Sequence, residues 1–185
     1  MSRVLVSGSR DWTDTTLIEQ ALNGALALLN VPATMQHTVT LVHGAAKGLD
    51  SLAAQAAQRR GWQIEGHPAQ WDTHTDACPA WHQGLPTCKM AGHRRNHEMI
   101  ALGADLLVSF PLGTEKSGHS KGTWGCTRAA MVAGLPTVVV WKNSFYPWGP
   151  AAERLVIAER AVSGKPAAAY AAAAALLDTL TPTPF

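Results

Sequence analysis

The sequence predicts an α/β protein with a Rossmann-like three-layer fold, and three observations support this prediction. Short runs rich in Val, Ile and Leu alternate with segments of helical periodicity. Runs such as "TVVVW" are almost entirely apolar, which is typical of strands buried on both faces. Strands that alternate with helices need crossover connections, so the sheet must be mainly parallel. We therefore expect a sheet of about five or more strands, followed by a helical C-terminal tail.

Five runs are predicted to be strands because they are short and rich in branched or aromatic residues. Their ranges are 4–7, 38–42, 62–66, 106–110 and 137–140.

The first predicted helix begins near Asp14, whose carboxylate can accept a hydrogen bond from a first-turn amide. Apolar residues then recur at helical spacing as far as Leu29. Three further segments repeat this pattern, and each is followed by a glycine at the position of a helix C-cap. These segments are 48–60, 95–102 and 123–133, with Gly61, Gly103 and Gly134 at their ends.

A chain of 185 residues is long enough for one domain with a substantial core. Residues 1–142 are predicted to form this domain. Residues 143–185 are predicted to be a helical extension of the same domain, with helices over 151–162 and 165–180. An irregular excursion over 68–93 is rich in Trp, His, Pro and Cys, and a loop of this length is usually functional or held by a metal.

Charge and hydropathy narrow the possible partners. The formal net charge of +2 is too small to predict a nucleic-acid surface, so we expect no nucleic-acid partner. No apolar stretch reaches the roughly 20 residues that a membrane helix needs, and the chain starts directly with a strand, so we expect a cytoplasmic protein without a membrane partner. Three cysteines do not suggest a disulfide scaffold. Abundant Ala and Trp are typical of a GC-rich bacterial or bacteriophage genome.

Four loops at predicted strand ends share a composition of glycines, hydroxyls and cations. In a parallel sheet these loops meet at one edge, where helix N-termini add partial positive charge. Together they predict an anionic ligand, most simply a nucleotide or a ribose phosphate. The loops are "SGSRDW" (7–12), "HGAAKGLD" (43–50), "GHRRN" (92–96) and "FPLGTEKSGHSKGTW" (110–124).

Four motifs within these loops carry a resemblance to a known family. In their order along the chain they resemble the signatures of the YspA-related (cpYpsA-related) branch of the SLOG superfamily. This superfamily includes the "Lonely Guy" phosphoribohydrolases and the DNA-uptake protein DprA. The resemblance covers roughly residues 3–141 and rests on "SGSRDWTD", "HGAAKGLDSLA", "AGHRRNHEM" and "GTWGCTRAA".

The resemblance implies a Rossmann-like fold that binds nucleotides or nucleotide-derived ligands. Related proteins often pair, so a homo-oligomer is expected. Matching by position gives the ligand-binding set, to which the neighbouring Trp12, Lys47 and Trp124 are added. The matched residues are Gly8, Ser9 and Arg10 in the first loop, Gly44, Gly48 and Asp50 in the second, Arg95 and Asn96 in the third, and Gly122 and Thr123 in the fourth.

The departure from the phosphoribohydrolase motif bears on catalysis. There the fourth element reads like P-G-G-x-G-T-x-x-E, and its glutamate takes part in glycosidic cleavage. Here Cys126 stands three residues after Thr123, and a thiol substitutes poorly for a carboxylate. Sensing or sequestering of a ligand is therefore the leading hypothesis. The alternative is an N-glycosidase acting on nucleoside phosphates through Glu115 or Asp50, and a second alternative is single-stranded nucleic-acid binding.

Several of these side chains have a second interpretation. Asp50 either serves as an acid/base group or caps a helix, and His43 either takes part in catalysis or fixes its loop. Trp12 and Trp124 either stack on a base or pack in the core. Arg10 and Arg95 are either phosphate clamps or members of surface salt bridges.

The excursion contains enough soft ligands for a tetrahedral zinc ion, although a binding module requires no cofactor. The predicted ligands are Cys78, His82, Cys88 and His93, with His74 and His97 nearby. The alternative is a thiol-containing excursion that Trp71 and Trp81 pack. A zinc ion here would be structural, because it would replace a missing core beneath the excursion.

Overall fold

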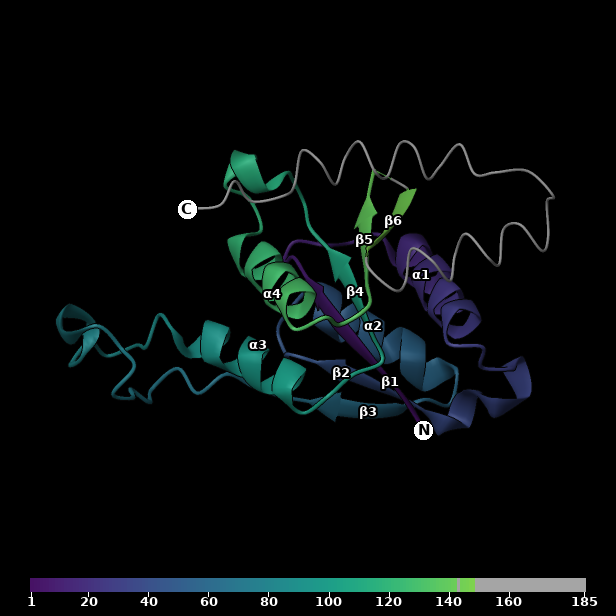
Figure 1. The fold of residues 1–185 in the computed structure, drawn as a ribbon, viewed down its shortest axis with the longest axis horizontal. Helices are drawn as coiled ribbons and strands as arrows, with labels where there is room; N and C mark the ends of the chain where they lie inside the picture. The colour runs from purple at the N-terminus through teal and green to yellow at the C-terminus, as the bar shows by residue number, and fades with distance from the viewer. Residues whose placement is uncertain (143, 149–185) are drawn as a thin grey trace.

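A six-stranded sheet forms the centre of the computed structural model, which describes residues 1–142 and 144–148 (Figure 1). The strand order is β3-β2-β1-β4-β5-β6. The first five strands are parallel, and β6 runs antiparallel to β5 at one edge. The strands are β1 (Ser2–Gly8), β2 (Val39–His43), β3 (Gln63–Gly66), β4 (Leu106–Phe110), β5 (Thr137–Trp141) and β6 (Ser144–Trp148).

Within the described residues, four α-helices cover the two faces of the sheet (Figure 1). The helices α1 and α2 pack on one face, and α3 and α4 pack on the other. Three short 3₁₀ helices lie in the connections. The elements are α1 (Thr15–Leu28), α2 (Leu49–Arg59), α3 (Ala91–Ala101), α4 (Lys121–Val132), η1 (Ala33–Thr38), η2 (Ala80–His82) and η3 (Glu115–Ser117).

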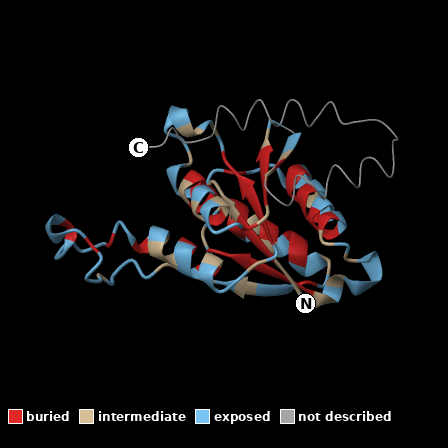
Figure 2. Ribbon diagram, in the orientation of Figure 1, coloured by how far each residue is buried: buried red, intermediate tan, exposed pale blue. Residues whose placement is uncertain are grey.

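The core follows from the alternation of side chains along the strands. In β1, Val4 and Val6 pack toward α1 and α2, whereas Leu5 packs toward α3 and α4. Figure 2 shows this burial in the strands and on the inner sides of the helices. Because both faces are covered, a strand can be apolar along its whole length, as β4 is.

The predicted fold class is confirmed, and all five predicted strands are present with small shifts at their ends. Gly61, Gly103 and Gly134 have φ values of +75°, +86° and +72°, as expected after a helix. Two larger differences from the prediction remain: β6 was not predicted, and α3 begins at Ala91 rather than at Arg95. The helices predicted over 151–162 and 165–180 lie outside the described residues.

The excursion between β3 and α3 extends away from the sheet, beyond the N-terminal end of α3 (Figure 1). Most of it is exposed (Figure 2). Its small interior consists of Cys78, Cys88 and Ala91, against which Ala69 packs. Over the described part of the chain, no helix is both long enough and apolar enough to cross a bilayer.

Candidate functional site

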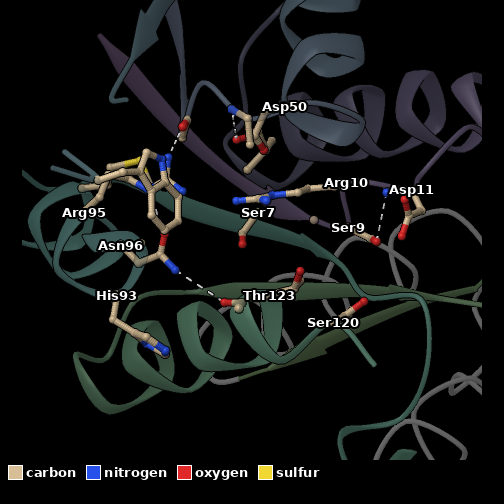
Figure 3. Close-up of a pocket in the computed structure, with 18 of the residues that line it drawn as sticks. Ser7, Ser9, Arg10, Asp11, Asp50, His93, Arg95, Asn96, Ser120 and Thr123 are labelled. Carbon is tan, nitrogen blue, oxygen red and sulfur yellow. Dashed lines mark hydrogen bonds between the residues drawn. The ribbon is translucent and has the colours of Figure 1, made fainter. Parts of the chain in front are cut away.

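A cavity of about 380 Å³ opens at the C-terminal edge of β1, where the strand order reverses. Ligands of open α/β sheets bind at such a reversal, and the volume suits a small molecule. Figure 3 shows side chains from loops far apart in the sequence around this space. Of the residues expected at the site, those that line it are Gly8, Ser9, Arg10, Gly44, Asp50, Arg95, Asn96, Gly122 and Thr123.

Arg10 extends into the cavity between Asp50 on one side and Thr123 on the other (Figure 3). Its guanidinium carbon lies 5.6 Å from the centre of the Trp71 ring, within the range of a cation–π contact. Within residues 1–142 and 144–148, Arg10 has no carboxylate partner closer than 4 Å. Its donors are therefore available to an anion, and the structure does not show the surface salt bridge that was the alternative interpretation.

Three helices begin at the rim of this cavity: α2 after Gly48, α3 after Met90 and α4 after Ser120. In the described structure none of the three has a side-chain N-cap, although capping side chains normally satisfy first-turn amides. Helix α1 begins outside the cavity and is capped by Asp14, which accepts from the Leu17 amide at 3.0 Å. Two first-turn amides already have backbone partners, because Leu49 donates to the Ser9 carbonyl (3.2 Å) and Ala91 to the Cys88 carbonyl (3.1 Å). The remaining first-turn amides and the partial positive charge of the uncapped ends lie at the cavity.

Arg95 is a clamp between elements rather than a free cation. Its Nη1 donates to the carbonyl oxygens of Gly44 and His67, the latter at 2.9 Å, and its Nε donates to Asn96 Oδ1 at 3.0 Å. These bonds join α3 to the ends of β2 and β3. Burial lowers the pKa of Arg95, and the nearby Asp50 carboxylate opposes this shift. Arg95 therefore shapes the cavity wall.

The glycines of the first two loops allow close packing between the loops. A Cβ on Gly8 would collide with Leu49, and a Cβ on Gly44 would collide with the Arg95 guanidinium. Gly48 has a φ of +72° and lies against the Arg10 carbonyl, where a side chain would be both strained and obstructed. We expected these glycines to let an anion approach the main chain. In the structure they let other parts of the protein approach it instead.

Asp50 is buried in the cavity wall, where its Oδ2 accepts from the Ala46 amide at 3.1 Å. Burial raises the pKa of Asp50, although this hydrogen bond and the nearby His43 oppose the shift. Asp50 thus ties the β2–α2 loop rather than capping its own helix. His43 accepts the Ala45 amide at Nδ1 (3.1 Å), and burial lowers the pKa of its ring, so it fixes the same loop.

Five expected site residues lie away from the cavity lining. The indole of Trp12 packs edge-on against Phe110, and the indole of Trp124 donates to the Gly113 carbonyl at 3.0 Å. Both are buried, so they pack in the core rather than offering a face to a base. Glu115 forms an ion pair with Arg128 at 2.8 Å and does not face the cavity. The remaining two are Lys47 and Gly48.

Two residues of the excursion line the cavity although we did not expect them there: Trp71 and Lys89. His93 also lines it, and it belongs to the loop 92–96 that we expected at this edge. Trp71 is 41% exposed, unlike the buried Trp12 and Trp124. We expected Trp71 to pack within the excursion. The path of this irregular segment back to the sheet edge carried no sequence signal, so its approach to Arg10 could not be predicted.

A second cluster lies in the excursion, where ligand atoms of His74, Cys78, His82 and Cys88 are all within 4.8 Å of one another. These four residues could hold a metal ion. Of the predicted ligands, Cys78, His82 and Cys88 belong to this cluster, and His93 does not. His93 instead lines the ligand cavity, with its ring next to Gly125 of α4. The fourth ligand position belongs to His74.

Cys78 of this cluster differs in character from Cys126. The pKa of Cys78 is lowered to about 6, first of all by hydrogen bonding from the backbone at Thr75. Burial raises the pKa of Cys126 to about 11. Cys126 is therefore a protonated thiol inside α4, and it does not replace the glutamate of the phosphoribohydrolase motif.

Comparison with known sequences finds a family model and a related protein that match this chain. The family model described as "YspA, cpYpsA-related SLOG family" matches residues 2–74. The Gene 61 protein of Mycobacterium phage D29 is 36% identical over 143 residues, which cover 75% of this chain and 95% of that protein.

Comparison with solved structures gives DNA processing protein A (DprA) from Streptococcus pneumoniae, at a TM-score of 0.50 and 18% identity. The match covers 75% of this chain but only 50% of that one, so this chain spans half of the DprA chain. DprA from Helicobacter pylori, whose structure concerns its single-stranded DNA binding mode, has a TM-score of 0.46 at 18% identity, over 96% of this chain and 81% of that one.

The likeness to the Streptococcus pneumoniae protein corrects one expectation. We expected no nucleic-acid partner because the net charge is small, but a DNA-processing protein has the same fold. Net charge is a poor criterion here because a local set of cations can contact phosphates without a basic surface. With its fold, its motifs and its phage relative in agreement, the chain belongs to the YspA, cpYpsA-related SLOG family.

Proposed function

We propose that the cavity binds a nucleotide or a nucleotide-derived ligand through its phosphate and holds it without cleaving it. The single observation that carries this proposal is the convergence of three uncapped helix N-termini around the unpaired Arg10. An anion would satisfy the first-turn amides and the guanidinium at once. Lys89, which also lines the cavity, provides further positive charge.

The α4 end is the phosphate position that we favour. Gly122 and Thr123 of its first turn line the cavity, and the space around the Gly122 Cα is open. Ser120 does not cap this helix, and its hydroxyl instead accepts the Leu112 amide at 2.9 Å. The Arg10 guanidinium lies in the same cavity as Thr123 (Figure 3), so amides and a rigid fork of donors would meet the phosphate together.

Trp71 is the residue that we propose for stacking on the base. It lines the cavity beside Arg10 and has 41% of its surface exposed. An indole face offers a base about 1–3 kcal/mol of stacking without a sequence-specific hydrogen bond. Arg10 already lies over this ring, which leaves the guanidinium between the phosphate and the base positions.

The test is isothermal titration of the full chain with AMP, ADP, ADP-ribose and inorganic phosphate. A charge-assisted hydrogen bond contributes about 1.5–3 kcal/mol, so Arg10→Ala should weaken binding by roughly 10- to 100-fold. Arg59→Ala is the matched control, because Arg59 carries the same charge but pairs with Glu19 on an exposed surface. Equal affinities of the two variants, or no binding of any probe, would refute the proposal.

An N-glycosidase remains the second candidate, and the burial of Asp50 favours it. Burial raises the pKa of this carboxyl, as general acids require, whereas Glu115 lies outside the cavity. The assay is chromatographic detection of free base released from nucleoside monophosphates. Turnover that is lost in Asp50→Asn would favour the enzyme, and absence of turnover in the wild-type chain would favour binding alone.

Single-stranded DNA binding is the third candidate. It draws on the shared fold with DprA and on the exposed Trp71 beside Arg10 and Lys89, since aromatic rings and cations form stacking platforms for single strands. Fluorescence anisotropy with an oligothymidine at several salt concentrations tests it. Affinity that falls steeply with salt and is lost in Trp71→Ala would favour DNA over a mononucleotide.

A further inference from the structure

We propose that His74, Cys78, His82 and Cys88 bind one structural zinc ion, and that this ion fixes the part of the excursion that lines the ligand cavity. Two cysteines and two histidines are a common ligand set of structural zinc. Their four ligand atoms already lie within 4.8 Å of one another.

The separation of the two sulfurs agrees with a zinc ion between them. Cys78 Sγ and Cys88 Sγ are 3.7 Å apart. Two thiolates bound to zinc at about 2.3 Å and at the tetrahedral angle would be about 3.8 Å apart. A disulfide would bring the sulfurs to about 2.05 Å, so the two residues are placed as a pair of ligands.

The histidines supply an independent observation. In the described part of the chain, the buried nitrogens without a hydrogen-bond partner include His74 Nδ1 and His82 Nδ1, which both belong to this cluster. His74 Nε2 lies 2.9 Å from the Leu85 carbonyl, which can only accept, so the proton sits on Nε2 and the lone pair on Nδ1. A histidine ligand fixed by a backbone carbonyl through its other nitrogen is typical of metal sites.

His82 requires one local change. It is 1% exposed, and its Nε2 accepts the Lys89 amide at 2.8 Å. A neutral ring that binds zinc through Nδ1 carries its proton on Nε2 and can no longer accept this amide. We therefore expect the contact between His82 and Lys89 to open when zinc binds.

Arg94 completes the surroundings of the sulfurs. Its Nη1 donates to Cys88 Sγ at 3.0 Å and to Cys78 Sγ at 3.4 Å, while its Nη2 donates to the Thr73 carbonyl at 2.6 Å. Such donors hold thiolate ligands in place from outside the coordination sphere. Because Arg94 belongs to α3, the cluster is joined directly to the main body of the protein.

The link to the cavity runs through Cys88. Its amide donates to the Trp71 carbonyl at 2.6 Å, and Lys89 is its neighbour in the chain. Trp71 and Lys89 both line the ligand cavity. The excursion has little apolar core of its own, so an ion that replaces this core would hold both residues in position.

The first test is metal analysis of the untagged full chain, for which we expect one zinc ion per chain. Cobalt added to the zinc-free chain should give the visible absorption of a tetrahedral site and a thiolate-to-cobalt charge-transfer band. Cys78→Ser and Cys88→Ser should lose both signals. Cys126→Ser and His93→Gln are the matched controls, because neither residue belongs to the cluster, and both should keep them.

A wild-type chain without zinc and without the cobalt bands would overturn the proposal, and so would a mass loss of two hydrogens that maps to a Cys78–Cys88 disulfide. The wild-type measurements decide the question even if a serine variant fails to fold. Chelation of zinc should lower the affinity for the best nucleotide probe, and zinc should restore it. Zinc binding without nucleotide binding would refute the proposed function alone, and unchanged affinity after chelation would refute the link to the cavity.

Discussion

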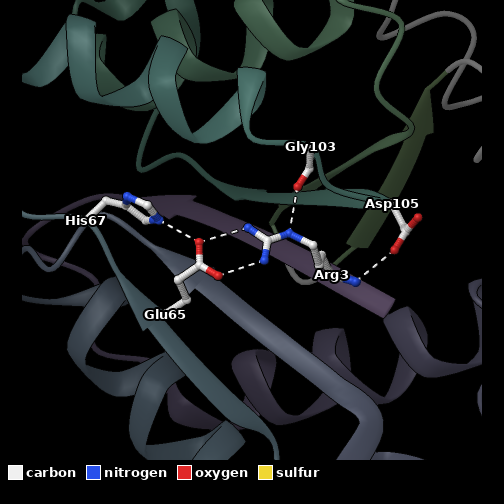
Figure 4. Close-up of polar contacts among 5 residues, drawn as sticks. All are labelled: Arg3, Glu65, His67, Gly103 and Asp105. Carbon is white, nitrogen blue, oxygen red and sulfur yellow. Dashed lines mark hydrogen bonds and ion pairs between the residues drawn. The ribbon is translucent and has the colours of Figure 1, made fainter. Parts of the chain in front are cut away.

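Arg3 of β1 and Glu65 of β3 form a bidentate ion pair that reaches across β2, with N···O distances of 2.7 and 2.8 Å (Figure 4). His67 Nε2 lies 2.7 Å from the same carboxylate, and Arg3 Nε donates to the Gly103 carbonyl at 2.8 Å. The pair thus joins an edge strand to the centre of the sheet and to the turn before β4. The Arg3 hydrogen bond, followed by that of His67, lowers the pKa of Glu65 to about 2.

This ion pair predicts a contribution to acid stability. The pKa of Glu65 lies below its ordinary value of 4.5, so its stabilising contribution is present above pH 4.5 and is lost as the pH falls toward about 2. Glu65→Gln should lower the free energy of unfolding at pH 7 and flatten its decline over this acid range. Urea denaturation at several pH values measures both effects. Glu19→Gln serves as the control on an exposed pair, and an acid slope in Glu65→Gln equal to that of the wild type would contradict the prediction.

Replacement of Gly44 predicts a loss of the Arg95 clamp. A Cβ at Gly44 would occupy the position of the guanidinium, so Arg95 must release the carbonyls that it joins. We expect Gly44→Ala to lower the free energy of unfolding by about 1–3 kcal/mol, as measured by urea denaturation. Gly24→Ala is the matched control, because Gly24 lies within α1 with open space around it, and it should stabilise by about 0.5–1 kcal/mol. A neutral Gly44→Ala would show that the clamp contributes nothing.

We predict that removal of the α1 cap lowers the stability of the protein and leaves ligand binding unchanged. Asp14 accepts from the Leu17 amide at the start of this helix, and loss of such a cap costs about 1 kcal/mol. Asp14→Ala should therefore lower the thermal midpoint, and Asp14→Asn should restore most of it because asparagine also caps. Titration with the nucleotide probe should give unchanged affinity for both variants. A loss of affinity would mean that α1 takes part in the site.

Asp50 predicts a pH dependence of the opposite sign to that of Glu65. Burial raises the pKa of Asp50 above its ordinary value of 3.8, so the folded state holds this proton more tightly than the unfolded state. Its contribution to stability therefore decreases as the pH rises from about 3.8 through the raised pKa. Asp50→Asn removes this decrease, and it should be more stable relative to the wild type at pH 7 than at pH 4. Urea denaturation at the two pH values would contradict the assignment if the difference were the same at both.

Most of the fold could be predicted because its central strands are buried on both faces and alternate with helices along the chain. A run such as "TVVVW" has few alternatives in a globular protein, and it became β5. The strand β6 could not be predicted in this way. It contains Pro147 within "NSFYPWGP", a composition that indicates a turn. It pairs antiparallel with β5 from Thr137↔Trp148 to Trp141↔Ser144, so two residues separate the strands in sequence. The partner strand is therefore close in sequence, but a proline within a run argues against a strand.

From the sequence we could predict which loops form the candidate site, but not which of their side chains face it. Parallel strands end at one edge, so the gathering of Arg10, Gly44 and Thr123 followed from topology alone. The direction of each side chain depends on packing, which placed Trp12 against Phe110 and brought Trp71 to the cavity instead. For the same reason, the sequence could not show that His74, rather than His93, joins the two cysteines and His82 in the cluster. Both histidines lay near the cysteines in sequence, and only the path of the excursion distinguishes them.

The packing of the first two loops determines how an arriving ligand would meet the protein. Leu49 donates its amide to the Ser9 carbonyl at 3.2 Å, and Gly48 lies against the Arg10 carbonyl, so the two loops are joined backbone to backbone. A change of side-chain rotamer leaves these two contacts intact. Trp71 and Lys89, on another wall of the cavity, belong to a separate segment. We therefore expect ligands of different size to be accommodated at Trp71 and Lys89 rather than at the first two loops.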